Sequence, residues 1–242
     1  MTRGARTGTM AAMTLSLHEV PGVPECTLPT DLRHTLPPNR APAPWTVAAR
    51  AVVWFARATP EANDALPPAL RARGRAAVVI GGLVRYADTP VGAYDEVFAA
   101  IGMRVGRHLI GTIPFMSVDS PTSLVGGRDN WSIPKTLSTF TGAPTEERFA
   151  STSATDREWS VTTSIRASGP RLPVFSRLRV IQQFPDGSLQ GTRLKANGRM
   201  RLADIEVDVQ SDGPLADWMV PGRRRGAVLE RTAFTLGAPQ PF

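Results

Sequence analysis

Short apolar runs separated by turn residues recur along most of this chain, and they constrain its fold more than any other feature. The clearest runs cover 45–58, 76–86, 92–104 and 108–118; they are rich in apolar and β-branched residues, and Gly, Pro and Asp lie between them. Runs of this length and composition predict β-strands, and the tight connections favour antiparallel pairing. The first half of the chain therefore predicts an antiparallel sheet.

The second half repeats this pattern. Residues 157–166 and 201–210 alternate between apolar and polar side chains, as a strand with one wet face should. Residues 178–184 and 189–194 flank a Pro-Asp-Gly-Ser sequence at 185–188, which predicts a hairpin. Helical patterns are short, the best being 120–130 and 213–219. The chain thus predicts a strand-dominated α+β fold with a few short helices.

The N-terminal part differs from the rest. Residues 1–41 are rich in proline and have no sustained period, so they predict a partly ordered arm that leads into a single domain over 42–242. With 242 residues, 42% of them hydrophobic, the chain can close a core without metal or disulfide support. Cys26 is the one cysteine, and no Cys/His spacing of the zinc type occurs, so neither a disulfide nor a zinc site is expected.

Charge and hydropathy limit the partners. No run reaches membrane-spanning length, and a reducing compartment fits a single cysteine, so we expect a cytoplasmic protein without a membrane partner. The net charge of +7 comes almost wholly from arginine and would favour anionic ligands. The densest cluster, Arg223, Arg224 and Arg225, lies between Pro-Gly and Gly, which predicts a loop. Because no aromatic platform flanks this cluster, we expect no nucleic-acid partner, and a basic binding module is the weakest hypothesis.

Few residues carry recognisable chemistry. The chain has three histidines, no Gly-x-Ser-x-Gly elbow and no phosphate-cradling pattern after its Gly-Gly pair at 126–127, which disfavours a serine hydrolase, a metalloenzyme and a dinucleotide enzyme. What remains is Lys135, because lysine can lose its proton and become a nucleophile whereas arginine cannot. Its apolar neighbours at 133, 134 and 137 could carry the amine into an apolar pocket, where desolvation lowers the pKa of the ammonium. The sequence around Lys135 by itself favours the alternative, in which the side chain points to solvent.

Two segments resemble signatures of the acetoacetate decarboxylase family. Residues 127–137, Gly-Arg-Asp-Asn-Trp-Ser-Ile-Pro-Lys-Thr-Leu, resemble the family's Gly-Arg-Glu-…-Tyr-Pro-Lys-Lys-Leu, whose Pro-Lys pair carries the Schiff-base lysine. Upstream, Val-Gly-Ala-Tyr-Asp-Glu at 91–96 resembles the family's Gly-x-Tyr-x-Glu, and the interval from Glu96 to Lys135 fits the family spacing. A weaker likeness covers about 42–239. The resemblance implies an α+β barrel or cone of antiparallel strands with a few short helices, usually oligomeric.

The resemblance also implies a carbon–carbon lyase. Lys135 would form an iminium with a β-keto acid, and its cationic nitrogen would accept the electrons released as CO2 leaves. Glu96 would be the mobile carboxylate beside it, and Arg128 would orient the substrate carboxylate or make a buried ion pair. No metal or organic cofactor is implied, and the expected partners are a small keto acid and further copies of the chain. The candidates for substrate binding are Arg128, Arg50, Tyr94 and Trp131.

Two departures from the family pattern widen the range of reactions. Thr136 stands where the decarboxylases have a second lysine, so a lowered pKa of Lys135 would need burial or another cation such as Arg128. Counting back from Glu96 at constant register places Gly81 where the decarboxylases have a further glutamate. This glycine predicts a roomier and less acidic pocket. Relatives with altered pockets run aldol condensation or dehydration on larger keto acids, so this chemistry and decarboxylation both stay open. The alternative of a different class is a hydrophobic binding or cyclisation chamber without covalent catalysis, in secondary metabolism.

Overall fold

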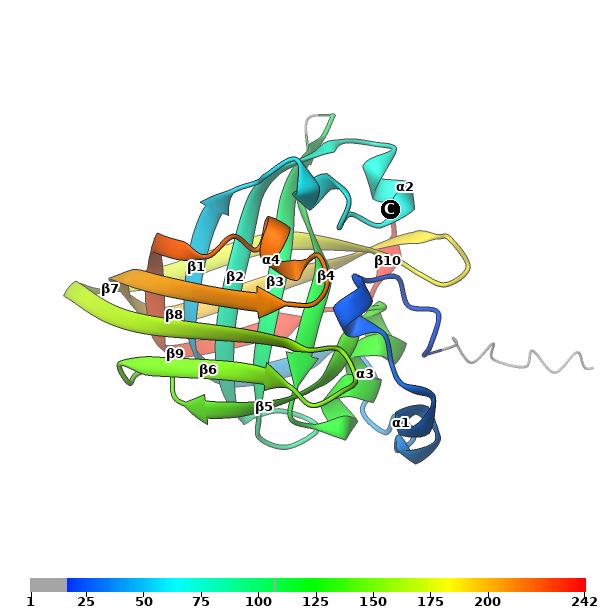
Figure 1. The fold of residues 1–242 in the computed structure, drawn as a ribbon, viewed down its shortest axis with the longest axis horizontal. Helices are drawn as coiled ribbons and strands as arrows, with labels where there is room; N and C mark the ends of the chain where they lie inside the picture. The colour runs from blue at the N-terminus through cyan, green and yellow to red at the C-terminus, as the bar shows by residue number, and fades with distance from the viewer. Residues whose placement is uncertain (1–16, 107) are drawn as a thin grey trace, which may run out of the picture.

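The computed structural model describes residues 17–106 and 108–242 (Figure 1). Four antiparallel strands form its centre: β1 (Trp45–Arg57), β2 (Arg75–Asp88), β3 (Tyr94–Val105) and β4 (His108–Val118). They confirm the four strands predicted for the first half. The longest connection, between β1 and β2, holds the short helices η2 (Glu61–Asn63) and α2 (Pro68–Arg71).

A helix after β4 changes the direction of strand pairing. α3 (Pro121–Trp131) leads from β4 to β5 (Lys135–Gly142), and β5 runs parallel to β4 with Met116 opposite Lys135. The expectation of a purely antiparallel sheet is therefore wrong here, because a helical crossover returns the chain to the same end of the sheet. The predicted helix at 120–130 is confirmed. None of the helices in the described part of the chain is long and apolar enough to cross a membrane.

β7 (Trp159–Gln183) and β8 (Leu189–Ser211) are longer than predicted and follow the short strand β6 (Arg148–Ser153). The sequence indicated two short strands in place of each, but β7 and β8 pair along almost their whole length. The Ser-Gly-Pro segment at 168–170 has the composition of a turn, but it lies within β7 at a register shift between Ser168 and Leu172. The predicted hairpin at 185–188 joins the two strands and is confirmed.

The arginine cluster lies in a strand and not in the predicted loop. β9 (Gly222–Leu236) includes Arg223, Arg224 and Arg225, and it pairs with both β1 and β8. Pairing with β1 on one side and with β8 on the other outweighs the turn-like composition. Without β9, the edges of β1 and β8 would expose unpaired backbone N–H and C=O groups. Arg223 and Arg225 also form ion pairs with Asp204 on β8, with N–O distances of 3.5 and 3.2 Å. α4 (Leu215–Trp218) is the helix predicted at 213–219.

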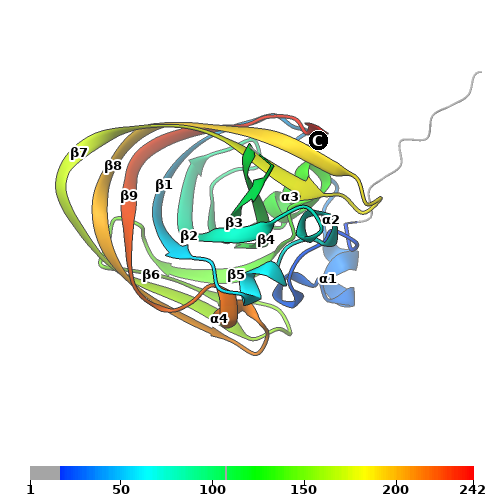
Figure 2. The same ribbon diagram turned by 90° about the horizontal axis from the view of Figure 1, so that it is seen from above.

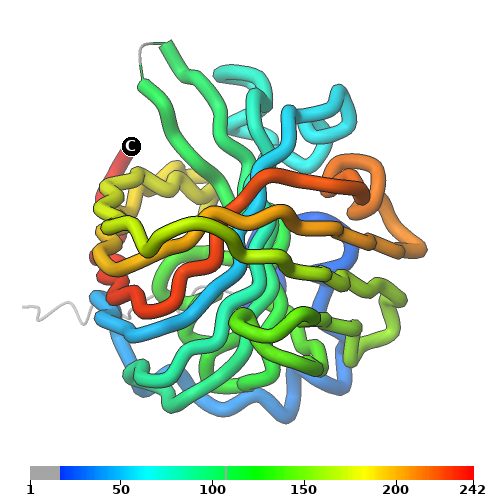
Figure 3. The backbone as a smooth tube through the Cα atoms, turned by 90° about the vertical axis from the view of Figure 1, so that its left-hand side faces the viewer, coloured from blue at the N-terminus to red at the C-terminus, as the bar shows by residue number. Residues whose placement is uncertain are grey.

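The sheet closes on itself. Its strand order is β10-β8-β7-β6-β5-β4-β3-β2-β1-β9, where β10 is Gln240–Pro241, and β8 also pairs with β9. In Figure 2, β7, β8 and β9 curve from the side of β5 and β6 round to the side of α3, with β1–β4 between these two sides. Figure 3 views this curved part of the sheet from outside. The predicted strand-dominated barrel or cone with a few short helices is confirmed.

The two faces of β1–β4 have different surroundings. One face carries Trp54, Val97 and Phe115 and packs with residues of β6, β7 and β8 as the main hydrophobic core. Successive strand residues point to opposite faces, so Ala51 and Val84 lie on the other face, in a separate apolar cluster. This second face, on the side of α3, also carries the candidate active site.

The segment before β1 packs against the domain. It contains η1 (Pro24–Cys26) and α1 (Thr30–Thr35), and the N–H of Val23 donates to Pro114 O at 3.1 Å. Glu25 is fully buried, and its Oε1 accepts hydrogen bonds from Ser211 Oγ at 2.8 Å and from the Leu215 N–H at 2.7 Å. These contacts hold the segment behind the turn that leads into β5.

Candidate active site

Lys135 lies at the start of β5, a few residues after α3 ends. Ser132 terminates the helix in the left-handed conformation, with a φ of 53°, and its N–H donates to Arg128 O. Pro134 then opposes a return to helix, and the chain continues as a strand from Lys135. The Lys135 side chain is buried, with 4% exposure, so the solvent-facing reading is wrong.

The amine of Lys135 has two polar partners and one aromatic neighbour. Its Nζ donates to Glu96 Oε2 at 2.9 Å and to Ser123 Oγ at 2.9 Å, and both partners are buried. The centroid of the Tyr94 ring lies 5.1 Å from Nζ, within the range of a cation–π contact. A carboxylate, a hydroxyl and a ring face therefore surround the nitrogen.

Glu96 is held by its neighbours on β2 and β3. The Tyr86 hydroxyl donates to Glu96 Oε1 at 3.1 Å, so both carboxylate oxygens have a partner. Tyr86 lies opposite Tyr94 in the sheet, and their rings stack with centroids 4.5 Å apart. Tyr94 and Glu96 share a face because they are two residues apart in one strand. The tyrosine pair thus orients both the carboxylate and the ammonium.

Two glycines allow α3 to approach the lysine closely. A Cβ on Gly127 would lie 2.6 Å from both Cδ and Cε of Lys135, and a Cβ on Gly126 would lie 2.5 Å from the Trp45 ring. At the other end of the helix, Ser120 Oγ accepts the N–H of Ser123 at 3.2 Å as an N-cap. The capped first turn places the Ser123 hydroxyl beside the Lys135 amine.

The protonation of Lys135 differs from the expectation. Burial is the largest single effect and lowers its pKa, but the Glu96 carboxylate at 2.9 Å and the Tyr94 side chain together outweigh burial and raise the pKa above the ordinary value of lysine. The expected lowering is therefore wrong for this arrangement, because it counted burial and did not include the negative charge of Glu96. Burial and the same carboxylate raise the pKa of the Tyr86 hydroxyl well above its ordinary value. At neutral pH Lys135 is an ammonium and Tyr86 a neutral donor.

Arg128 contacts the main chain of Lys135. Its Nε donates to Lys135 O at 2.6 Å, Nη1 to Leu17 O at 2.6 Å and Nη2 to Cys26 O at 2.5 Å. The side chain is buried, and burial lowers its pKa to about 10, which leaves it charged at neutral pH. Arg128 therefore ties the N-terminal segment to the turn that carries the lysine.

Two further candidates lie apart from the amine. The Trp131 indole packs edge-on against Trp45, with centroids 5.0 Å apart, and its Nε1 donates to Gly237 O at 2.8 Å. Arg50 is exposed and lies between Ala49 and Ala51 on β1, so it points to the face opposite Glu96. Of the four candidates for substrate binding, Tyr94 is the one that lies against Nζ.

Gly81 and Thr136 both face the main core. A Cβ on Gly81 would lie 2.3 Å from the Trp54 indole. The expectation of a roomier pocket is therefore wrong, because Trp54 fills the space beside Gly81. Thr136 is fully buried next to Lys135 in β5 and therefore points to the opposite face. A side chain at 136 is directed away from the Lys135 amine.

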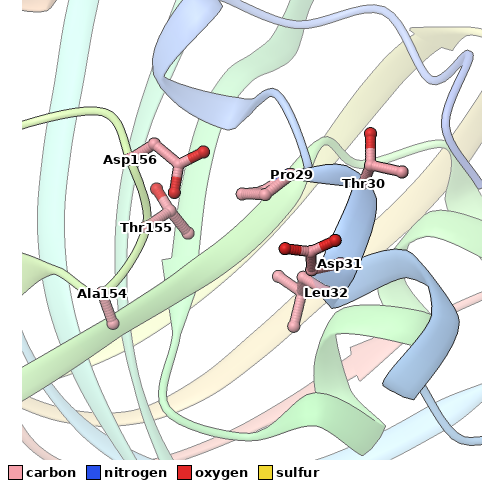
Figure 4. A pocket seen from close by; sticks show the side chains of 7 residues that line it. All are labelled: Pro29, Thr30, Asp31, Leu32, Ala154, Thr155 and Asp156. Carbon is pink, nitrogen blue, oxygen red and sulfur yellow. The ribbon is translucent and has the colours of Figure 1, made fainter.

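Two surface clefts do not contain the amine. One of about 420 Å³ lies between α1 and the β6–β7 turn (Figure 4). Its acidic residues are Asp31 and Asp156. The other, of about 660 Å³, borders β6, β7 and β8. Neither is lined by Lys135 or Glu96. Across residues 17–106 and 108–242, no group of three His, Cys, Asp or Glu side chains is placed to hold a metal ion.

Comparison with protein families identifies the class of this chain. The family model of acetoacetate decarboxylase (ADC) matches residues 27–214, which is most of the sequence. The chain belongs to the acetoacetate decarboxylase family. No curated protein matches it.

Solved structures share the fold at low sequence identity. Acetoacetate decarboxylase from Legionella pneumophila is 16% identical, with a TM-score of 0.58 over 86% of this chain and 92% of that chain. The enduracididine biosynthesis enzyme MppR, complexed with pyruvate, is 14% identical, with a TM-score of 0.59 over 83% and 91%. An acetoacetate decarboxylase-like enzyme from Sphingomonas wittichii RW1 is 16% identical, with a TM-score of 0.53 over 84% and 93%. At this identity the likeness establishes the fold, and the reaction must be argued from the site.

Sequence reasoning missed three residues that shape the site. Ser123 lies in a Ser-Pro-Thr-Ser helix start, whose N-cap composition is visible in the sequence. Gly127 begins the 127–137 motif, but its close approach to the Lys135 side chain depends on the packing of α3 against β5. Tyr86 lies outside both motifs, and its contact with Glu96 depends on the pairing of β2 with β3.

Proposed function

We propose that this protein is a lysine Schiff-base lyase that acts on a keto acid. The observation that carries the proposal is the buried pair of Lys135 and Glu96, 2.9 Å apart, in a member of the acetoacetate decarboxylase family. A buried amine whose proton has an adjacent carboxylate acceptor is suited to condense with a carbonyl group. Decarboxylation and aldol or dehydration chemistry can both start from that adduct.

The reaction begins with proton transfer and addition. Lys135 gives a proton to Glu96, and the nitrogen lone pair forms a bond to the carbonyl carbon. The carbonyl oxygen takes up one proton from the nitrogen and one from Glu96 and leaves as water, which produces the iminium. With a β-keto acid, the bond to the carboxylate carbon breaks, its electron pair moves to the iminium nitrogen and CO2 leaves. The enamine then takes a proton on carbon, and water hydrolyses the iminium.

The aldol branch differs after the iminium. Loss of a proton from the neighbouring carbon gives an enamine, which attacks the carbonyl carbon of an aldehyde. Loss of water from that product is the dehydration step, and a second water hydrolyses the iminium and frees Lys135. Glu96 is the acid and base in both branches, because it is the carboxylate within hydrogen-bond distance of Nζ.

The neighbours of the pair have supporting roles in this proposal. Tyr86 holds Glu96 through Oε1, and Ser123 holds the amine on its other side. Tyr94 offers a ring face to the cationic nitrogen of both the ammonium and the iminium. We assign Arg128 a positioning role through the main chain of Lys135.

The second candidate is a hydrophobic binding or cyclisation chamber without covalent catalysis, in secondary metabolism. The raised pKa of Lys135 favours it, because an ammonium is not a nucleophile. One of the fold relatives is an enduracididine biosynthesis enzyme. The two candidates differ in what they expect of Lys135→Ala: chemistry stops in the first and persists in the second.

Reductive trapping separates the candidates. The protein is incubated with pyruvate, acetoacetate or a longer keto acid, borohydride is added, and the intact mass is measured for wild type, Lys135→Ala and Lys195→Ala. Lys195 is exposed on β8 and serves as the matched control. We expect a substrate-sized mass increase in wild type and Lys195→Ala and none in Lys135→Ala. An adduct that persists in Lys135→Ala, or turnover without any adduct, contradicts the Schiff-base proposal.

We also propose that the protein forms a homo-oligomer in the cytoplasm. Light scattering of the purified chain would measure the assembly, and a monomeric mass would contradict this part of the proposal.

A further inference from the structure

A row of apolar side chains begins beside Glu96 and crosses five further strands. Each member lies opposite the next in the pairing of neighbouring strands, and cross-strand partners share one face of a sheet. From β3 to β7 the row is Glu96, Val84, Ala51, Leu229, Met200 and Leu172. The carboxylate of the candidate active site therefore lies at one end of a continuous apolar row.

The rows on either side continue this surface. Val53, Ala227 and Leu202 lie next to the row toward one end of the strands, opposite one another in turn. Toward the other end, Ala49 lies opposite Thr232, whose buried hydroxyl has no hydrogen-bond partner among residues 17–106 and 108–242. We call this surface, from Val84 on β2 to Leu172 on β7 with its flanking rows, the apolar face.

The apolar face passes from buried to exposed. Val84 and Ala51 are 3% and 1% exposed, whereas Leu172 and Leu202 are 37% and 55% exposed. Phe234, two residues beyond Thr232 on β9, packs against both the cluster of Ala51 and Val84 and the cluster that contains Trp131 of α3, so the face lies on the side of α3 (Figure 2). It therefore extends from side chains buried beside Glu96 to side chains that are exposed.

The opposite face of the same strands is cationic. Arg177 on β7 lies opposite Lys195 on β8, and Arg199 lies opposite Arg231 on β9, all of them exposed. Over 172–178 of β7 and 194–202 of β8, alternation thus places the charged side chains on the opposite face, and beyond Leu202 the apolar face ends at the ion pairs of Asp204 with Arg223 and Arg225. An apolar surface that reaches solvent beside a reactive pair is typical of a ligand-binding site.

The charges around the site favour the same ligand. The three hydrogen bonds of Arg128 all go to main-chain carbonyls, and Arg50 points to the other face. Neither arginine is therefore placed to bind a substrate carboxylate on this face. Affinity has to come from apolar contact, which grows with the length of the hydrocarbon part of a ligand.

We propose that the apolar face binds the hydrocarbon part of the substrate, so that the substrate is a keto acid with a long alkyl or aryl chain beyond its carbonyl. This inference rests on the proposed function for the chemistry at Lys135. The carbonyl carbon reaches Nζ while the chain lies along Ala51, Leu229 and Met200 toward Leu172. A short keto acid reaches the same nitrogen but gains none of these contacts.

The test measures chain-length dependence by two readouts. Straight-chain 3-oxo acids of four, eight and twelve carbons are trapped with borohydride, and the matching methyl ketones are titrated by calorimetry. We expect affinity to rise about fourfold for each added methylene in wild type. Met200→Gln and Leu172→Gln should reduce this gain for the long ligands and leave the four-carbon acid unchanged. Leu172 is partly exposed, so its variant should fold. Arg199→Gln, on the cationic face of the same strand, should behave as wild type.

Each remaining result overturns one proposal or the other. Adducts that form equally well at every chain length overturn the apolar-face proposal and leave the Schiff-base proposal intact. Chain-length dependence by calorimetry without any adduct overturns the Schiff-base proposal and leaves the apolar face as a binding site. If Met200→Gln and Leu172→Gln dissociate an oligomer and leave the chain-length dependence unchanged, the face is an interface between copies of the chain.

Discussion

The two lysines of the chain lie in opposite surroundings. Lys195 is exposed on β8, where polar residues, four of the five basic, alternate with apolar residues or glycine over 193–201. Lys135 is buried at the junction of α3 and β5, with a carboxylate, a hydroxyl and an aromatic ring around its amine. The chain thus places the same amine once in water and once in an enclosed site.

The difference between these regions lies in how many parts of the chain determine each side chain's surroundings. Alternation within one strand is enough to turn Lys195 outward. The surroundings of Lys135 need Glu96 from β3, Ser123 and Gly127 from α3, and Tyr86 from β2. Substitutions around Lys135 should therefore have large effects on stability and chemistry, and those around Lys195 small ones.

Removing the charge of Glu96 should have the largest effect on this contrast. Glu96→Gln leaves a buried ammonium without its carboxylate, which we expect to lower the stability at neutral pH by about 3 kcal/mol. Burial is the largest effect on Lys135, and without the charge of Glu96 it lowers the pKa of Lys135. The pH dependence of adduct formation should shift to lower pH than in wild type, measured by trapping across a pH series. Asp95→Asn is the control, because Asp95 pairs with Arg85 and points to the opposite face.

The same pair predicts how wild-type stability depends on pH. The pKa of Lys135 is raised in the folded protein, so its contribution to stability is present below the unfolded value of about 10.4 and is lost as pH rises through the higher folded value. Denaturation by urea should show this loss in wild type above about pH 10. A Glu96→Gln protein that loses the same stability over that range would contradict the assignment to this pair.

Narrowing the space beside Lys135 should have a smaller effect. Gly127→Ala places a methyl group 2.6 Å from two carbons of the lysine side chain, and we expect a loss of stability of about 1–3 kcal/mol and slower adduct formation. Gly111→Ala is the control, because the nearest atom to its added Cβ is 4.0 Å away. Urea denaturation and the rate of trapping measure the two effects. Equal behaviour of both variants would show that α3 can shift away from β5 without consequence.

The smallest effect is expected on the outside of the curved strands. Lys195→Gln and Arg199→Gln should each change the stability by no more than about 0.5 kcal/mol, because both side chains are exposed. Adduct formation should be unchanged in both. A larger loss in thermal denaturation would mean that this cationic face is covered in the assembled protein.

Local patterns in the sequence predicted much of the fold. The apolar runs at 76–86 and 108–118 predicted β2 and β4, and the Pro-Asp-Gly-Ser turn predicted the hairpin between β7 and β8. The errors arose where pairing with distant strands outweighed local composition. The Arg223 cluster lies in β9 because β1 and β8 both pair with it, and a register shift keeps β7 continuous through Ser168.

The sequence by itself determined the family and predicted that Glu96 and Lys135 belong to one site. The motifs around Glu96 and Lys135 are local, and a fixed interval between two motifs is readable without coordinates. Tertiary structure alone decided the protonation of Lys135, because desolvation and the carboxylate of Glu96 act on its pKa in opposite directions. The tertiary structure also determined that Arg50 points away from the site and that Arg128 donates to main-chain carbonyls. Such outcomes depend on distances between residues far apart in the chain, and a linear sequence does not contain those distances.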